Sequence, residues 1–274
     1  YGSRAANGVV IITTKTGKRD AHTTANYSAY VSASTLGKTL DFFGPEEIRQ
    51  GLTNYSDKGY DTDWLDAITR TAFTQNHNFN ITGGNQKTTY SADFTYRKEE
   101  GTILNTWGES MRMRFDVSHW MLNDMLKVNL NMVKSRHKSG PVSGSGVYRY
   151  AIMRNPTEPI YNEDGSYYEN FAINYFYNPV GMLQEVEGES TNENTRMTGN
   201  VTFEPIKGWQ TNLMVARNTT MTHGRNYQTS KHYSQVSAYR TGYASQSHYE
   251  YVTDNMELPS KYNHTWEKHR MAAL

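Results

Sequence analysis

The chain has 274 residues, and its 28 Lys and Arg residues against 27 Asp and Glu residues give a formal net charge of +1 at pH 7. This balance removes the usual electrostatic argument for nucleic acid as a partner. Cysteine is absent, which excludes a disulfide framework, a thiolate nucleophile and a metal site with Cys ligands. No apolar run approaches the roughly 18 residues of a membrane-spanning helix, so a helical membrane protein is also excluded.

Tyrosine is the unusual feature of the composition, with 21 residues in the chain. It favours strands, and it favours membrane interfaces, where one end of the ring is apolar and the other is wet. A polar average composition is compatible with a membrane β-barrel, because every second residue of a barrel strand faces a polar interior.

The first predicted element in chain order is a strand formed by Val9, Val10, Ile11 and Ile12. These residues leave no polar side, so the pattern predicts a strand that is buried on both faces. Such a strand needs neighbours on both edges, and the eight residues before it do not supply them. Because the chain also begins at Tyr1 without Met, we expect it to be a segment of a longer protein.

After a polar turn at residues 17–20, apolar and polar residues alternate along most of the chain. A period of two predicts antiparallel strands with one apolar and one polar face. The stretch 36–72 is less regular, and acidic first turns after Gly44 and Asp63 predict two short helices in a folded loop. The residues that we expect on the apolar, lipid-facing side are Tyr90, Phe94, Met113, Phe115, Val128, Leu130, Leu213 and Val215.

The predicted connections alternate between long and short. In chain order they cover residues 36–72, 83–86, 99–106, 122–124, 137–193, 206–208, 222–250 and 267–268. Short periplasmic turns and longer extracellular loops are typical of outer-membrane barrels. Trp120 does not fit this interpretation, because it lies on the polar side of its strand rather than on the outward side, where interfacial aromatic residues are expected.

The sequence contains no recognisable catalytic motif. Its nine His residues show no metal-ligand spacing, and the paired carboxylates Glu46–Glu47 and Glu99–Glu100 are explained by a helix first turn and a strand end. We therefore expect neither enzymatic activity nor a cofactor or metal.

The long connection 137–193 is rich in aromatic residues. Aromatic rings stack on the apolar faces of sugars, and tyrosine can also bond to their hydroxyl groups. The candidate substrate contacts are Tyr161, Tyr167, Tyr168 and Phe171. The alternative is that these side chains pack the loop on itself or against a partner protein.

Three stretches of the sequence resemble one protein family. YGSRAANGVVIITTKTGK is similar to the end of the plug domain in SusC/RagA-type TonB-dependent outer-membrane transporters. WLDAITRTAFTQNHNFNITGGNQKTTYSADFTYRKEEGTI is similar to their first barrel hairpins, and NPTEPIYNEDGSYYEN is similar to their large extracellular loop. The order and spacing of these stretches agree as well, so the resemblance covers essentially the whole chain.

The resemblance implies an all-β protein, an antiparallel transmembrane β-barrel of about 22 strands around a plug domain. Residues 1–19 would be the end of the plug, and residues 20–274 would hold roughly nine strands of the barrel. It implies TonB-dependent uptake of glycan fragments or peptides across the outer membrane of a Gram-negative, Bacteroidetes-like bacterium. The implied partners are a SusD-like surface lipoprotein, the TonB–ExbB–ExbD complex, the oligosaccharide or peptide ligand, and outer-membrane lipid.

Two other interpretations of the residues stay open. A soluble or surface-anchored β-sandwich that binds carbohydrate, as an adhesin does, would turn the same apolar side chains toward a dry centre between two sheets. A secreted glycoside hydrolase would need two carboxylates that face each other across a cleft. The direction in which the apolar side chains point separates the barrel from the sandwich.

Overall fold

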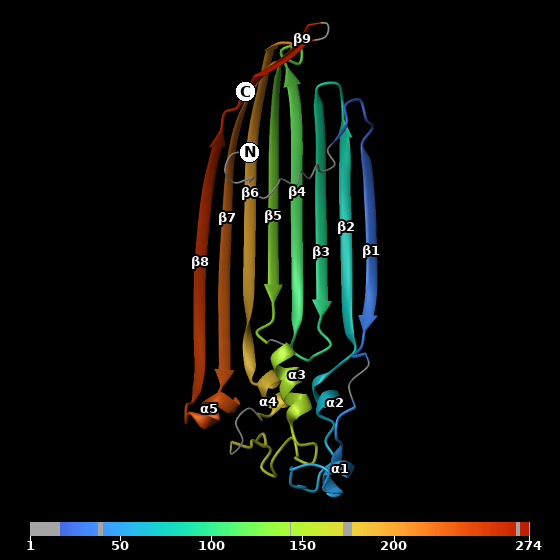
Figure 1. Cartoon of the computed structure of the whole chain (residues 1–274), viewed down its shortest axis with the longest axis vertical. Coiled ribbons are helices and arrows are strands. Elements are labelled where there is room, and N and C mark those ends of the chain that lie inside the picture. The colour runs from blue at the N-terminus through green and yellow to red at the C-terminus, as the bar shows by residue number, and fades with distance from the viewer. Residues whose placement is uncertain (1–16, 38–40, 143, 172–176, 267–268, 274) are drawn as a thin grey trace.

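The computed structural model describes residues 17–37, 41–142, 144–171, 177–266 and 269–273. The strand predicted at Val9, Val10, Ile11 and Ile12 lies outside the described residues, as does most of the predicted plug segment 1–19. The described residues form one long antiparallel sheet, and five short helices gather at one of its ends (Figure 1). This end is called the long-loop end below, and the opposite end is called the turn end.

The sheet has ten strands, and their order across it follows the order in the sequence. The strands are β1 (Thr24–Ser34), β2 (Ala72–Gly84), β3 (Thr88–Glu100), β4 (Trp107–Met121), β5 (Leu126–Ser139), β6 (Val186–Ile206), β7 (Trp209–Thr229), β8 (Gly242–Glu257), β9 (Ser260–Trp266) and β10 (His269–Ala273). Within the described residues the sheet does not close on itself, so β1 lies at an open edge. An all-β antiparallel fold is therefore confirmed, as an open wall in this segment.

The helices at the long-loop end are short. They are α1 (Pro45–Arg49), α2 (Trp64–Ile68), α3 (Gly144–Met153), α4 (Pro179–Gln184) and α5 (Tyr233–Ser237). The first two are the helices predicted after Gly44 and Asp63. No helix in the described part of the chain is long and apolar enough to cross a membrane.

The sequence predicts roughly nine barrel strands, and the tenth arises where a proline divides one of them. Both β8 and β9 pair with β7, β8 through Met214 to Thr229 and β9 through Trp209 to Thr211. Between them Pro259 has no N–H to donate, although its carbonyl oxygen accepts a bond from the Asn212 backbone N–H at 2.9 Å. Because β8 and β9 follow one another along the same edge of β7, the ten strands lie side by side in nine rows.

Two of the long connections are shorter than predicted. The expected loop at 222–250 is wrong over most of its length, because β7 continues to Thr229 and β8 begins at Gly242. The expected loop at 137–193 is reduced to 140–185. In these strand ends polar and aromatic residues occupy both faces, so no apolar alternation marks them. The strands therefore extend well beyond the apolar part of the sheet.

Strand register places all eight residues predicted to face lipid on one face of the sheet. Leu130 lies opposite Gly199, which in turn lies opposite Val215. Met113, Phe115, Leu130 and Val215 are between 46% and 58% exposed. The half-buried members of the set are Tyr90, Phe94, Val128 and Leu213. In a β-sandwich a second sheet would cover them, whereas the described strands form a single sheet. Contact of this face with lipid stays a prediction.

The opposite face of the sheet carries a network of amides and carboxylates. The Asn80 side chain donates to Asp93 at 2.6 Å across β2 and β3. Farther along, Asn129 and Asn131 on β5 donate to Oδ2 of Asp116 on β4, at 3.3 and 3.0 Å. Asp116 is buried, so its bonds replace those that water would make. The two faces therefore differ as the barrel interpretation requires.

The turn end of the sheet holds the segment that precedes β1. Arg19 binds both carboxylate oxygens of Asp124, at 2.7 and 3.0 Å. Its guanidinium also lies 4.0 Å from the centre of the Trp120 ring, and Lys127 Nζ lies 4.9 Å from the same centre. This arrangement explains Trp120, because on the polar side of β4 it supplies an aromatic face for two cations.

The same segment approaches the β2–β3 turn closely. A Cβ atom on Gly17 would lie 2.6 Å from the carbonyl oxygens of Gly83 and Tyr90, so only glycine fits there. The Gly84 backbone N–H donates to the Ala21 carbonyl at 3.1 Å. Residues 17–23 are thus fixed across the turns that precede β3 and β5.

We expect Leu130→Arg or Phe115→Arg to block assembly in the outer membrane, because each places a charge on the exposed apolar face at a cost of roughly 2–4 kcal/mol near the middle of a bilayer. The matched control is Thr198→Arg, which places the same charge on the opposite face. The measurement is the fraction of protease-resistant receptor in isolated outer membranes. Equal assembly of all three variants would contradict the assignment of the faces.

Asp124→Asn should expose the segment at Arg19 to trypsin, because the neutral amide no longer holds the guanidinium on Trp120. Cleavage after Lys18 and Arg19 is expected to become several-fold faster, as measured by mass spectrometry of a timed digest. The control is Asp20→Asn, which removes a neighbouring charge and leaves the contact with Asp124 intact. If both variants are cleaved at the wild-type rate, the contact does not hold the segment.

Candidate ligand-binding site in the long loops

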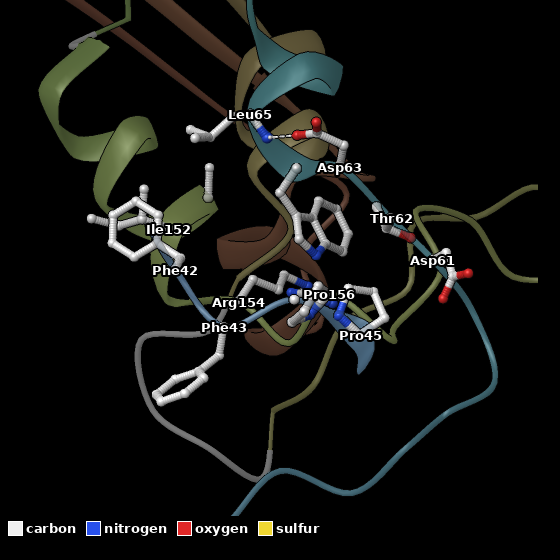
Figure 2. Close-up of a pocket in the computed structure, with 13 residues that line it drawn as sticks. Phe42, Phe43, Pro45, Asp61, Thr62, Asp63, Leu65, Ile152, Arg154 and Pro156 are labelled. Carbon is white, nitrogen blue, oxygen red and sulfur yellow. Dashed lines mark hydrogen bonds between the residues drawn. The ribbon is translucent and has the colours of Figure 1, made fainter. Parts of the chain in front are cut away.

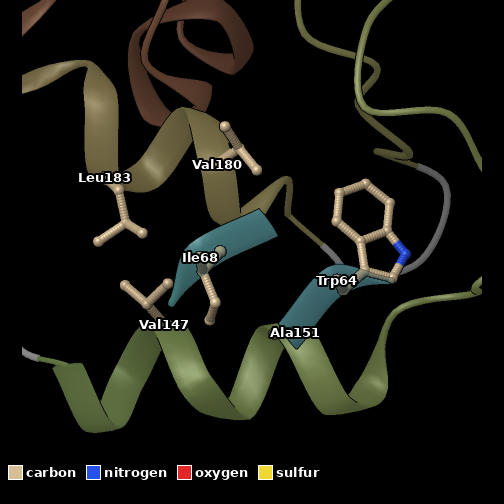
Figure 3. Packing of buried hydrophobic residues seen from close by; sticks show 6 residues of the cluster. All are labelled: Trp64, Ile68, Val147, Ala151, Val180 and Leu183. Atoms are coloured by element: carbon tan, nitrogen blue, oxygen red, sulfur yellow. The ribbon is translucent and has the colours of Figure 1, made fainter. Parts of the chain in front are cut away.

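Three helices from separate connections pack together at the long-loop end of the sheet. They share an apolar core, in which Ile68 and Leu183 are 0% and 1% exposed. Figure 3 shows the facing side chains, which are Trp64 and Ile68 of α2, Val147 and Ala151 of α3, and Val180 and Leu183 of α4. Connections that are far apart in the sequence therefore form one folded unit.

Capping side chains fix where two of these helices begin. Oδ1 of Asp63 accepts from the backbone N–H groups of Leu65 and Asp66, at 3.0 and 2.9 Å. Asn178 accepts in the same way at the start of α4, from the N–H groups of Val180 and Gly181. Both are preferred helix-capping residues, because a short side chain reaches the free N–H groups of the first turn.

The first long connection is bound to the stretch around Thr157. The Tyr60 backbone N–H donates to the Thr157 carbonyl at 3.2 Å, and the Thr62 N–H donates to Pro156 at 2.8 Å. The Asn155 side chain donates to the Ser56 carbonyl at 2.9 Å. Thr157 is fully buried, so the bond from Tyr60 satisfies a carbonyl group that water does not reach.

A buried arginine lies beside this core. The Arg154 side chain is 0% exposed, and its Nε lies 3.2 Å from Glu158 Oε2. Its Nη1 lies 3.8 Å from Glu169 Oε2, and its Nη2 donates to the Tyr168 carbonyl at 2.6 Å. The guanidinium also lies 4.9 Å from the centre of the Trp64 ring. Burial lowers the pKa of Arg154, and the two carboxylates oppose that change.

Glu169 is the second member of this buried ionic group. Its Oε2 accepts from the Asn178 backbone N–H at 2.9 Å, whereas its buried Oε1 has no hydrogen-bond partner within the described part of the chain. Burial raises the pKa of Glu169 to about 7, against the opposing effects of the Asn178 bond and Arg154. The carboxyl group therefore changes charge near neutral pH.

Two pockets border the ionic group. The first has a volume of about 420 Å³, and Phe42, Phe43 and Pro45 line it together with Trp64 and Arg154. Figure 2 shows the side chains that line this pocket. Phe43 is 62% exposed, so its ring is available to a ligand. Asp61 also lines this pocket and is paired with Arg49 at 2.6 Å.

The second pocket has a volume of about 430 Å³ and lies between residues 162–171 of the connection 140–185 and the residues around α5. Tyr167, Glu169 and Phe171 line it on one side, and Lys231 and Val236 line it on the other. It combines aromatic surface with groups of both charges, which suits a ligand that has apolar faces and many hydrogen-bonding groups.

Two of the four predicted substrate contacts, Tyr167 and Phe171, line this pocket, whereas Tyr161 and Tyr168 line neither of the two pockets. Tyr161 and Phe171 are each 45% exposed, and the Tyr161 ring lies 5.4 Å from that of Tyr167. The Tyr167 hydroxyl is within hydrogen-bond distance of Glu185 at 2.9 Å, and burial with this carboxylate raises its pKa. Tyr168 is half-buried and lies against Arg154. Ligand contact by the four residues stays a prediction, and Tyr161 and Phe171 have the freer rings.

Sequence reasoning missed Phe42, Phe43, Arg154 and Glu169. No spacing or motif marks them, because they come from different connections and meet only after the loops pack. A second aromatic group was also missed as a unit. In it the Tyr177 ring lies 3.9 Å from that of Tyr233.

No group of three or more His, Asp or Glu side chains is placed to hold a metal ion among the residues that the structure describes. The long-loop end offers a ligand aromatic rings, amides and two buried carboxylates.

Comparisons with known proteins agree with this architecture. No family model matches the chain. It is 31% identical over 193 residues to the TonB-dependent receptor SusC of Bacteroides thetaiotaomicron, covering 65% of this chain and 19% of that protein. It is 28% identical over 221 residues to the TonB-dependent receptor P3 of Formosa agariphila, covering 76% of this chain and 22% of that protein.

The fold matches solved structures of the RagAB peptide importer. In the closed-closed state the TM-score is 0.77 at 22% identity, with 99% of this chain and 36% of that chain covered. The chain is a relative of the SusC/RagA-type TonB-dependent receptors. It spans about a fifth of the length of the curated SusC/RagA-type relatives it matches.

The pKa of Glu169 predicts a pH-dependent stability of the loop unit. Because this pKa is about 7 in the folded protein and ordinarily 4.5, the folded loops bind the proton more tightly than the unfolded loops. The stabilisation is complete below pH 4.5 and is lost as the pH rises through about 7, on the order of 3 kcal/mol in total. Glu169→Gln should remove this dependence and make the loops more stable than wild type at pH 8.

The measurement is hydrogen exchange of residues 144–171 between pH 4.5 and 8, corrected for the intrinsic pH dependence of exchange. The exposed Glu163→Gln variant is the control for loss of a carboxylate from the same loop. A wild-type pH profile in Glu169→Gln would contradict the assignment.

Proposed function

We propose that the chain forms part of the wall and the extracellular loops of a TonB-dependent receptor that imports glycan fragments or peptides across the outer membrane. The observation that supports this most directly is the division of the sheet into an exposed apolar face and a hydrogen-bonded polar face. A wall between lipid and a hydrated interior needs this division. The names of the relatives, TonB-dependent receptors and a peptide importer, support the same proposal.

The ligand would bind at the long-loop end, beside the two pockets at the buried ionic group. Tyr161 and Phe171 would contact it through their exposed rings, while Tyr167 and Tyr168 would hold the loop in shape through bonds to Glu185 and contacts with Arg154. No covalent step on the ligand is involved. Binding would be followed by movement of a plug that precedes β1 in the chain.

The partners follow from the proposed class. A SusD-like lipoprotein would cover the long-loop end, where Phe43 and Phe171 offer exposed aromatic surface. TonB with ExbB and ExbD would supply energy from the periplasmic side, through parts of the receptor other than this sheet. The protein would lie in the outer membrane of a Bacteroidetes-like bacterium, in line with the named source organisms of the relatives.

Growth on defined nutrients tests the proposed function. A strain without the receptor, supplied with single glycans or peptides, should fail on the imported one and recover with the wild-type gene. Tyr161→Ala and Phe171→Ala should weaken binding of that ligand by a few-fold to about tenfold each, because an aromatic contact contributes about 0.5–1.5 kcal/mol. Binding is measured by calorimetry on the purified receptor.

The control is Tyr239→Ala, which removes a ring that is 99% exposed and lies outside the connection 140–185. Full activity of Tyr161→Ala and Phe171→Ala would contradict the site and leave the transporter class intact. A receptor that is released from cells into buffer without detergent would contradict the class itself.

A further inference from the structure

Two histidines on neighbouring strands form a pair that the proposed transport function does not use. Register places His223 of β7 directly opposite His248 of β8. Their Nδ1 atoms are 3.1 Å apart, whereas the ring centres are 4.4 Å apart, so each ring turns this nitrogen toward the other. Sequence spacing does not mark the pair, because 25 residues separate its members and only strand pairing joins them.

The pair is open to solvent. Both rings are exposed, and they lie on the same face of the sheet as Val215. His223 is eight residues farther along β7 than Val215, which corresponds to about 27 Å of extended strand. The next residues in the same row are Thr191 on β6 and Lys138 on β5, so the surface beside the pair is polar. Dissolved ions therefore have access to the two nitrogens.

The surface around the pair carries no net charge. Within two rows on either side, β5 to β8 place four basic and four acidic side chains on this face, which are Lys134, Arg136, Lys138, Arg225, Glu187, Glu189, Glu193 and Glu250. Lys138 and Arg225 both bind Glu189, at 3.3 and 2.7 Å. Glu250 is two residues from His248 on β8, and it has no ion-pair partner within the described part of the chain. A cation at the pair is therefore not repelled.

The spacing of the two nitrogens fits one shared metal ion. An imidazole nitrogen binds Zn²⁺ at about 2.0–2.1 Å, so two nitrogens on one ion are roughly 2.8–3.4 Å apart in square-planar or tetrahedral geometry. The observed 3.1 Å lies within this range. Without a metal, one Nδ1 donates its proton to the other. Metal binding moves that proton to Nε2 of the same ring, and both imidazoles stay neutral.

We propose that His223 and His248 bind one divalent transition-metal ion, Cu²⁺ or Zn²⁺, through their Nδ1 atoms, with water in the remaining positions. Imidazole suits these ions, whereas Mg²⁺ and Ca²⁺ prefer oxygen ligands. The bound ion links β7 to β8 and stabilises their pairing, because it binds only where the strands are paired. The alternative is an ordinary hydrogen bond between the rings, which predicts no metal affinity.

The experiment measures metal binding to the full-length receptor, purified in nonionic detergent without a polyhistidine tag. Equilibrium dialysis against CuCl₂, ZnCl₂ or MgCl₂ is followed by elemental analysis of the protein. Cu²⁺ should bind more tightly than Zn²⁺, as it does at most nitrogen sites, and Mg²⁺ should not compete. The electron paramagnetic resonance spectrum of the bound Cu²⁺ should show splitting from two nitrogen ligands.

Three variants locate the site. His223→Gln and His248→Gln should each weaken Cu²⁺ binding by at least about tenfold, because a single imidazole loses the gain from two linked ligands. The matched control is His137→Gln, which removes an exposed imidazole that bonds to Ser110 rather than to another histidine. It should retain the wild-type affinity. Protease resistance in detergent checks that each variant is folded.

Wild-type affinity in His223→Gln or His248→Gln would overturn the proposal, as would an equal loss of affinity in His137→Gln. Competition by Mg²⁺ would also overturn it, by showing a site made of carboxylates. The spectrum of wild type is a test that needs no variant, and a Cu²⁺ signal without nitrogen splitting would contradict the site. Metal binding is measured without uptake, so its failure leaves the proposed transport function intact.

Discussion

Strand register is the constraint on which the rest of this structure depends. A slip of one residue in β5 would move Leu130, which is 58% exposed, to the polar face and turn Asn129 outward. The β4–β5 ladder is unbroken from Gly108 and Ser139 to Met121 and Leu126, and the β-turn at its end returns the Met125 N–H to the Leu122 carbonyl. Successive positive φ angles in this turn leave little freedom to change its length. The tight turn therefore sets which side chains lie on the apolar face of the sheet and which lie on the polar face.

The long-loop end depends on a different kind of interaction. There a small apolar core is joined to a buried ionic group, and Arg154 contacts residues from separate connections. Removing one partner of a buried ion pair leaves a charge without compensation, so such a group ties the connections to one arrangement more than it adds stability. The pockets on either side of it are consequently bounded by fixed backbone, which is the condition for a preformed binding site.

The sequence was sufficient for features that depend on local pattern. Alternation identified eight residues, from Tyr90 to Val215, that share one face of the sheet, and acidic first turns located α1 and α2. Prediction from the sequence failed where apolar and polar residues do not alternate. The parts of β7 and β8 nearest the long-loop end carry polar residues on both faces, so they were expected to be a loop. Pairing between the strands holds these parts together, and pairing cannot be inferred from either strand alone.

The candidate site shows the same limit more sharply. The aromatic residues Tyr161, Tyr167, Tyr168 and Phe171 were visible in the sequence, because composition alone distinguishes them. Their division into two structural and two exposed rings was not visible, since it depends on Glu185 and Arg154, which come from other elements. The stretch that begins at Asn155 is similar to an extracellular loop of the family, and in the structure its first residues bind the connection that carries Ser56. The resemblance to the family identified the stretch, and the packing explains why Asn155 is needed there.

Contacts between separate segments hold both ends of the sheet. At the long-loop end the connections share one core, and at the turn end residues 17–23 are held by the β2–β3 turn and by Arg19 on Trp120 and Asp124. Gly17 lies too close to two carbonyl oxygens to shift without separating from the sheet. Movement of residues 17–23 away from the sheet therefore has to break the Arg19 contacts with Trp120 and Asp124 and the bond from Gly84 to Ala21.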